Sequence, residues 1–202
     1  MRGLRRAPLL TTALLLGLGV GANAGPASLM CDDTLPTLIG TEDDDRIVGT
    51  PLDDVIVALG GNDLVEGGDG NDTICGGPGS DSLHGGIGTD LLFGQRGDDS
   101  LYGGRDGDVL DGGDGPDVLY GDRGNDRVGG GAGEDTLIGL GGSDVLLGGA
   151  HFDVILGLKG HDNISGGSGP DMLDGGSGND RVDGGKGRDS CRHAEQVLAC
   201  EL

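Results

Sequence analysis

Residues 67–75 read Gly67-Gly68-Asp69-Gly70-Asn71-Asp72-Thr73-Ile74-Cys75, and this nine-residue pattern decides the fold. The same order, Gly-Gly-x-Gly-x-Asp-x-U-x with U an aliphatic residue, recurs from Gly40 to Arg192, and we number its positions one to nine. Position six is aspartate in seventeen consecutive units: Asp45, Asp54, Asp63, Asp72, Asp81, Asp90, Asp99, Asp108, Asp117, Asp126, Asp135, Asp144, Asp153, Asp162, Asp171, Asp180 and Asp189. A fixed period of this kind indicates a repeat architecture.

Each position of the repeat has a physical role. Glycine at positions one, two and four permits tight turns with positive φ. Positions seven to nine favour a short strand, in which alternation turns position eight inward and its neighbours outward. Position eight is Ile, Leu or Val in every unit except the last, where it is Cys191. Nine residues cannot complete a coil, whereas eighteen can, as turn, strand, turn and strand.

The sequence therefore predicts an all-β fold, a parallel β-roll. Such a roll is a right-handed β-solenoid of two facing parallel sheets with eighteen residues per turn. Successive coils would stack at about 4.8 Å, the spacing of strands in a sheet. The core between the sheets would be one aliphatic side chain deep per strand.

The composition makes this fold conditional on a cation. The 202 residues include 48 Gly, 2% aromatic residues and no Trp, so large side chains for an ordinary core are few. Such a mixture with a net charge of −22 would suggest disorder, but a disordered tract would not keep its apolar residues in phase. Stacked aspartates about 5 Å apart repel by about 1 kcal/mol even in water. Calcium, which accepts six to eight oxygens in flexible geometry, suits carboxylates beside turn carbonyls better than magnesium does.

The repeat resembles the hemolysin-type calcium-binding (RTX) nonapeptide family over residues 40–192. The resemblance implies that multiple calcium ions lie between stacked turns, held by the position-six aspartates and by carbonyls of the glycine-rich positions. Pairs such as Asp72 with Asp90, or Asp81 with Asp99, would share an ion. Seventeen turns contain fifteen pairs of this spacing, which is an upper bound on interior sites.

Four segments are expected. Residues 1–24 have a basic start, an apolar run and the small-x-small sequence Ala22-Asn23-Ala24, which is typical of a cleaved signal peptide. Residues 25–39 are expected to form an N-terminal cap, residues 40–192 the array, and residues 193–202 a C-terminal cap of helical or turn-like form. Removal of three arginines with the signal peptide leaves 10 Lys+Arg against 35 Asp+Glu, a charge of −25. The mature protein is expected to be secreted and extracellular, with no membrane span.

The four cysteines are expected to form disulfides, because an even count in a secreted chain favours them. Three pairings are possible. We favour Cys31–Cys75 and Cys191–Cys200, each of which would fasten one end of the array. A zinc site is the weaker alternative, since no Cys-x-x-Cys spacing is present.

The sequence favours a calcium-binding structural or binding module that is not an enzyme. The four histidines occupy different repeat positions and form no recognisable catalytic motif. The negative charge argues against nucleic acids and anionic membranes as partners. The alternative function is a calcium-dependent adhesin or polysaccharide-binding protein, and a third is an enzyme hidden in the repeat surface.

A possible partner face is set by position nine of alternate units. Tyr102, Tyr120, Ile138 and Leu156 lie eighteen residues apart and should form one outward column. The ordinary interpretation is the β-propensity of these residues. The alternative is an exposed apolar patch that binds an extracellular protein or glycan, or a second copy of the chain.

Overall fold

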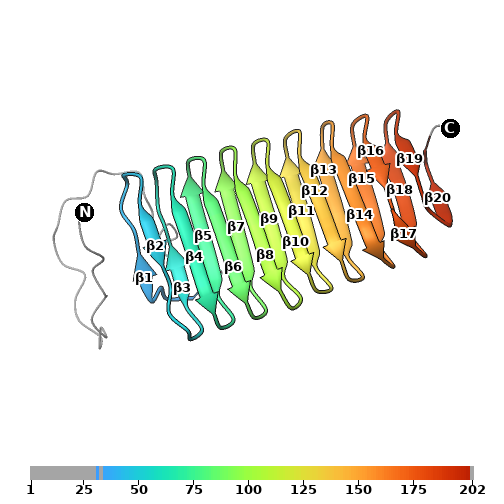
Figure 1. Cartoon of the computed structure of the whole chain (residues 1–202). Helices are drawn as coiled ribbons and strands as arrows, with labels where there is room; N and C mark the ends of the chain where they lie inside the picture. Colours follow the sequence, from blue (N-terminus) through green and yellow to red (C-terminus); the bar gives the residue numbers. More distant parts are fainter. Residues whose placement is uncertain (1–30, 32–33, 201–202) are drawn as a thin grey trace.

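The computed structural model describes Cys31 and residues 34–200. The predicted signal peptide (1–24), most of the N-terminal segment and residues 201–202 lie outside the described residues. The described chain is an all-β parallel solenoid of about nine coils that runs as one elongated stack from β1 to β20 (Figure 1). It contains no helix among the described residues, so none that is long and apolar enough to cross a membrane.

Two parallel sheets face each other, and the chain alternates between them. Sheet 1 contains β1 (Leu38–Ile39), β3 (Val55–Val57), β5 (Thr73–Pro78), β7 (Leu91–Arg96), β9 (Val109–Asp114), β11 (Arg127–Ala132), β13 (Val145–Ala150), β15 (Asn163–Ser168), β18 (Arg181–Lys186) and β20 (Gln196–Leu198). Sheet 2 contains β2 (Arg46–Val48), β4 (Leu64–Asp69), β6 (Ser82–Ile87), β8 (Ser100–Arg105), β10 (Val118–Arg123), β12 (Thr136–Gly141), β14 (Val154–Gly160), β16 (Met172–Asp174) and β19 (Ser190–Arg192), with β17 (Ser177–Gly178) paired to β14.

The register confirms the predicted coil of eighteen residues. Leu119 of β10 lies opposite Leu101 of β8 and Leu137 of β12, and the same offset holds from β1 to β19. Most strands are longer than predicted, because they continue from position seven through position three instead of ending at position nine. Identical turns stacked on one another keep the glycine-rich positions in register, so parallel pairing extends into them.

Position eight forms the predicted single-file core. Every aliphatic residue at this position from Leu38 to Val182 is buried between the sheets. Branched side chains of similar size stack on copies of themselves and exclude water along the whole solenoid. Cys191, at the same position of the last unit, packs against the end of this cluster.

The turns depend on positive φ at positions two and four. Most of these residues are glycines, but Leu59, Gln95, Asp106, Asp122, Leu140, His151 and Leu158 also have positive φ. His151 has the largest value of the non-glycine residues, +84°. The turn that contains it nevertheless keeps Asp153 fully buried and in line with its neighbours.

Both predicted disulfides are present, one at each end. Cys31–Cys75 fastens the N-terminal segment to the outer face of sheet 1, where Val57 and Phe93 join a small apolar cluster. Cys191–Cys200 closes a loop at the other end. The C-terminal segment is not helical: it forms strand β20, because its backbone completes the parallel ladder of β18.

Candidate metal centre

The turns that join the two sheets lie in two rows (Figure 1). The position-six aspartates form two ladders, one along each row of turns. From Asp45 to Asp171, the backbone N–H of each position-six aspartate donates to Oδ1 of the aspartate eighteen residues later, as from Asp72 to Asp90 at 2.8 Å and from Asp90 to Asp108 at 2.8 Å. The bond recurs without a gap from Asp45 to Asp189, at 2.8–3.0 Å wherever an aspartate is the acceptor. One carboxylate oxygen per turn is thus satisfied by the protein.

The second carboxylate oxygen is not satisfied. From Asp63 onward each position-six aspartate is at most 3% exposed, and its Oδ2 makes no hydrogen bond with any described residue. This set comprises Asp63, Asp72, Asp81, Asp90, Asp99, Asp108, Asp117, Asp126, Asp135, Asp144, Asp153, Asp162, Asp171, Asp180 and Asp189. A buried charge without a partner is strongly destabilising, so fifteen such oxygens in regular rows call for a counter-charge.

The unpartnered oxygens face carbonyls of the next coil. A Cβ added to Gly103 would lie 2.5 Å from Asp108 Oδ2 and 2.8 Å from the carbonyl oxygen of Gly121. A Cβ on Gly67 would likewise meet Asp72 Oδ2 at 2.5 Å and the Gly85 carbonyl at 2.6 Å. Position one is glycine in every unit except that of Ala58, and the close approach of these oxygens is the reason, since the φ of this position is not positive. Two oxygens from successive coils converge there on a space that a side chain would fill.

Burial raises the pKa values of the position-six carboxyls from Asp63 to Asp171, and in most of them a neighbouring aspartate of the same ladder adds to the effect. The pKa of Asp117 rises to about 7, chiefly by desolvation, with repulsion from Asp99 and Asp135, against a lowering by the hydrogen bond from Asp99 N–H. The pKa of Asp108, Asp126 and Asp153 also rises to about 7, and that of Asp72 and Asp81 to about 6. The fold therefore opposes ionisation of the ladder unless a cation is present.

The donor set fits a hard cation. Among the described residues no three His, Cys, Asp or Glu side chains converge on one point, so a site here must combine carboxylates with backbone carbonyls. An all-oxygen set of this kind suits calcium, whereas zinc favours nitrogen and sulfur ligands.

Comparison with known proteins agrees with this chemistry. The family model of the RTX calcium-binding nonapeptide repeat, four copies long, matches residues 39–74, 48–83, 76–110, 84–119, 102–137, 129–164, 138–173 and 156–191. Together these matches span residues 39–191. The chain belongs to the RTX calcium-binding nonapeptide repeat family. A search of the curated proteins finds no match.

The first two RTX turns differ from the others in a way that the sequence analysis missed. Oδ2 of Asp45 accepts hydrogen bonds from the backbone N–H and hydroxyl of Thr41, at 2.6 and 2.8 Å. Oδ2 of Asp54 accepts the same pair from Thr50, at 2.7 and 2.8 Å. Threonine at position two occurs only in these two units of the array, and that was the available signal. A second missed residue, Glu195, continues one of the ladders at the far end.

The predicted outward column is present on sheet 2, outside the core. Tyr120 lies in register with Tyr102 and Ile138, and Ile138 with Leu156, and all four side chains are half-buried. The rings of Tyr102 and Tyr120 stack with centroids 5.0 Å apart, and His84 extends the stack at 4.5 Å. The ring faces thus cover one another, and the edges are what the stack presents outward.

Proposed function

We propose that this protein is a secreted, non-enzymatic β-roll that takes its folded form by binding a row of calcium ions. The observation that carries the proposal is the series of buried Oδ2 atoms without a protein partner, which from Asp72 onward lie beside a carbonyl of the next coil. The two disulfides support an oxidising, extracellular setting.

The ligands would come from pairs of aspartates eighteen residues apart. Oδ2 of the first aspartate and the position-one carbonyl of the next coil face the gap, and the carboxylate of the second aspartate borders it. Thirteen aspartates, Asp63 to Asp171, have both an unpartnered Oδ2 and a ladder partner eighteen residues later. Burial favours the protonated form of these carboxyls, and a bound calcium ion would supply the positive charge that stabilises their ionised form.

A calcium titration tests the proposal. Circular dichroism of the disulfide-bonded mature protein, at neutral pH and low salt, should change from unfolded to β at about 10⁻⁴–10⁻³ M calcium. Magnesium at the same concentrations should substitute poorly, because it requires compact octahedral geometry and retains its waters. A full β spectrum in excess chelator would contradict the proposal.

The outward column supports a second candidate function, calcium-dependent capture of an extracellular partner. Sugar recognition by stacking uses open aromatic faces, and the faces of Tyr102 and Tyr120 are turned toward one another. The edges, continued by Ile138 and Leu156, suit a protein surface better than a glycan. Glycan-array and protein pull-down binding, each with and without calcium, separates these two partner classes.

A further inference from the structure

The C-terminal segment is a contracted eighteenth repeat. β20 pairs with β18 so that Arg181 faces Gln196 and Val182 faces Val197, an offset of fifteen residues instead of eighteen. The backbone N–H of Gln196 donates to the carbonyl of Asp180 at 3.1 Å, as that of Arg181 donates to Asp162 at 2.8 Å. Glu195 therefore stands at position six and His193 at position one, with three turn residues missing between them.

Glu195 replaces the aspartate of the ladder. The N–H of Asp180 donates to Glu195 Oε2 at 2.6 Å, just as the N–H of Asp162 donates to Asp180 Oδ1 at 2.9 Å. The extra methylene of glutamate compensates for the shorter turn. The row of carboxylates that begins at Asp54 thus ends at Glu195.

The gap between Asp180 and Glu195 has the same unsatisfied oxygen as the interior gaps. Asp180 is 2% exposed, and its Oδ2 makes no hydrogen bond with any described residue. A Cβ on Gly175 would lie 2.9 Å from this Oδ2 and would collide with the carbonyl oxygen of His193. Oδ2 and a backbone carbonyl therefore converge here as they do beside Gly103.

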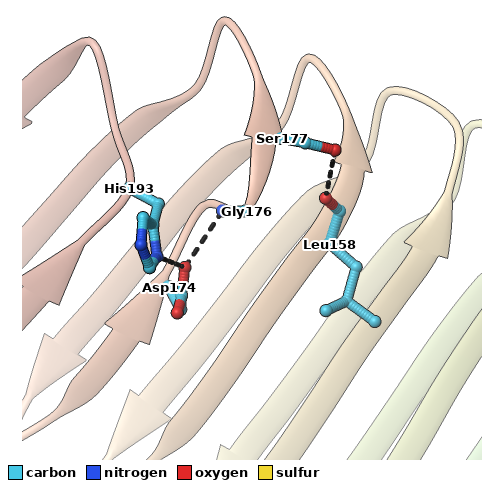
Figure 2. Close-up of polar contacts among 5 residues, drawn as sticks. All are labelled: Leu158, Asp174, Gly176, Ser177 and His193. Carbon is cyan, nitrogen blue, oxygen red and sulfur yellow. Dashed lines mark hydrogen bonds and ion pairs between the residues drawn. The ribbon is translucent and has the colours of Figure 1, made fainter.

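The cap holds that carbonyl in place. Nδ1 of His193 lies 2.8 Å from Asp174 Oδ1, which also accepts the N–H of Gly176 at 3.0 Å (Figure 2). Close by, the Ser177 hydroxyl donates to the carbonyl of Leu158 at 3.0 Å (Figure 2). The Cys191–Cys200 disulfide closes the loop that contains His193 and Glu195.

We infer that Asp180, Glu195 and the His193 carbonyl form a terminal cation site at the end of the ladder. Glu195 lies fifteen residues after Asp180, so this site is not one of the aspartate pairs with eighteen-residue spacing. The inference rests on the proposed function, because the cation would be calcium. The missing turn residues leave fewer carbonyls, and Glu195 is exposed, so water has to complete the coordination. This site binds calcium more weakly than the interior sites and fills last.

Glu195→Gln is the informative variant, because its amide oxygen can still accept the Asp180 N–H while the charge is lost. Glu134→Gln is the matched control, an exposed position-five residue of an interior turn. The measurement is a calcium titration of the ¹⁵N-labelled mature protein, with backbone amides followed residue by residue. Interior amides report the fold of each variant.

In the wild type, the amides of His193, Glu195 and Gln196 should shift in a late phase, after the interior amides. Glu195→Gln should weaken that phase by about tenfold or more and leave the interior phase in place, and Glu134→Gln should change neither. A late phase that survives in Glu195→Gln, or a wild type with an interior phase and no late phase, overturns the terminal site alone. A wild type with no calcium response anywhere overturns the proposed function as well.

Discussion

In the first two turns, Asp45 and Asp54 each accept two hydrogen bonds from a threonine four residues earlier. From Asp63 onward the equivalent oxygen is buried and makes no hydrogen bond with a described residue. The strands differ in parallel: β2 and β3 have three residues each, and the strands from β4 to β13 have six. The same aspartate is thus satisfied by protein donors at the entry and needs an external cation in the interior.

The difference gives the two regions separate tasks. The entry turns end the ladder without leaving Oδ2 of the aspartate unsatisfied. The Cys31–Cys75 disulfide fastens the segment that precedes these turns to sheet 1. In the interior turns the stacked position-six carboxylates repel one another, and a bound cation would relieve that repulsion. A solenoid needs such modified ends, because its first and last coils have a neighbour on one side only.

Acidification should have the largest effect, since it acts on many interior aspartates at once. Several have pKa values raised to about 6 or 7, against 3.8 for an ordinary Asp. Between pH 7 and pH 4 the folded chain then binds more protons than the unfolded chain, so lower pH stabilises the calcium-free fold. We expect metal-free protein, prepared by dialysis, to gain β signal by circular dichroism as pH falls from about 7 to about 4.

Calcium should reverse that dependence. Protons compete with the ion for the same oxygens, so the thermal midpoint of the calcium-loaded protein should fall over the same pH range. A metal-free protein that instead loses β structure steadily on acidification would show that the interior carboxylates do not oppose folding.

Asp117→Asn compared with Asp54→Asn tests the contrast at single residues. Asp117→Asn removes charge from two adjacent gaps, so calcium stoichiometry by equilibrium dialysis should fall by about one or two ions. Asp54→Asn should leave the stoichiometry unchanged. It should still lower stability by about 1–3 kcal/mol, because its new amide group faces the donors of Thr50. Equal ion loss in both variants would abolish the distinction between entry and interior.

Thr50→Val should have a smaller effect, confined to stability. It removes the 2.8 Å hydroxyl bond to Asp54 Oδ2 and leaves the backbone N–H bond at 2.7 Å. We expect a loss of about 1–2 kcal/mol in thermal unfolding at saturating calcium. Thr136→Val, at position seven of an interior unit, is the control and should change stability by less than about 0.5 kcal/mol. Matching losses in the two variants would mean that the Thr50 hydroxyl does not satisfy Asp54.

The smallest effect on folding is expected from Tyr120→Ser combined with Ile138→Ser. Both side chains lie on the outer face of sheet 2, so the calcium midpoint of folding should move by less than about twofold. Self-association or partner capture, followed by light scattering and pull-down, should weaken if the column is a binding face. Collapse of the fold with binding intact would place these residues in a structural role instead.

Of three possible cysteine pairings, the sequence favoured the one that is present. By itself it determined the repeat, the coil of eighteen residues and the aliphatic core at position eight. These follow from spacing, because residues at equal intervals in a regular coil meet copies of themselves. Calcium as the family ligand followed from the same spacing of Asp72, Asp90 and their equivalents. The sequence also shows a threonine at position two of the first two units, but it does not show that the threonine hydroxyl donates to the aspartate of the same unit.

Only the tertiary structure decided which carboxylate oxygens of the position-six aspartates have a hydrogen-bond partner in the described residues and which have none. From Asp63 to Asp189, each position-six Oδ1 accepts from a backbone N–H of the preceding coil. Position-five side chains such as Asn62 and Asn71 accept from the following coil, which is the opposite direction. Glu195 joins its ladder through a coil shortened by three residues, which a search at fixed spacing passes over. The physical reason is that a period specifies which residues become neighbours, while hydrogen-bond direction and the cap geometry depend on the stacked backbone.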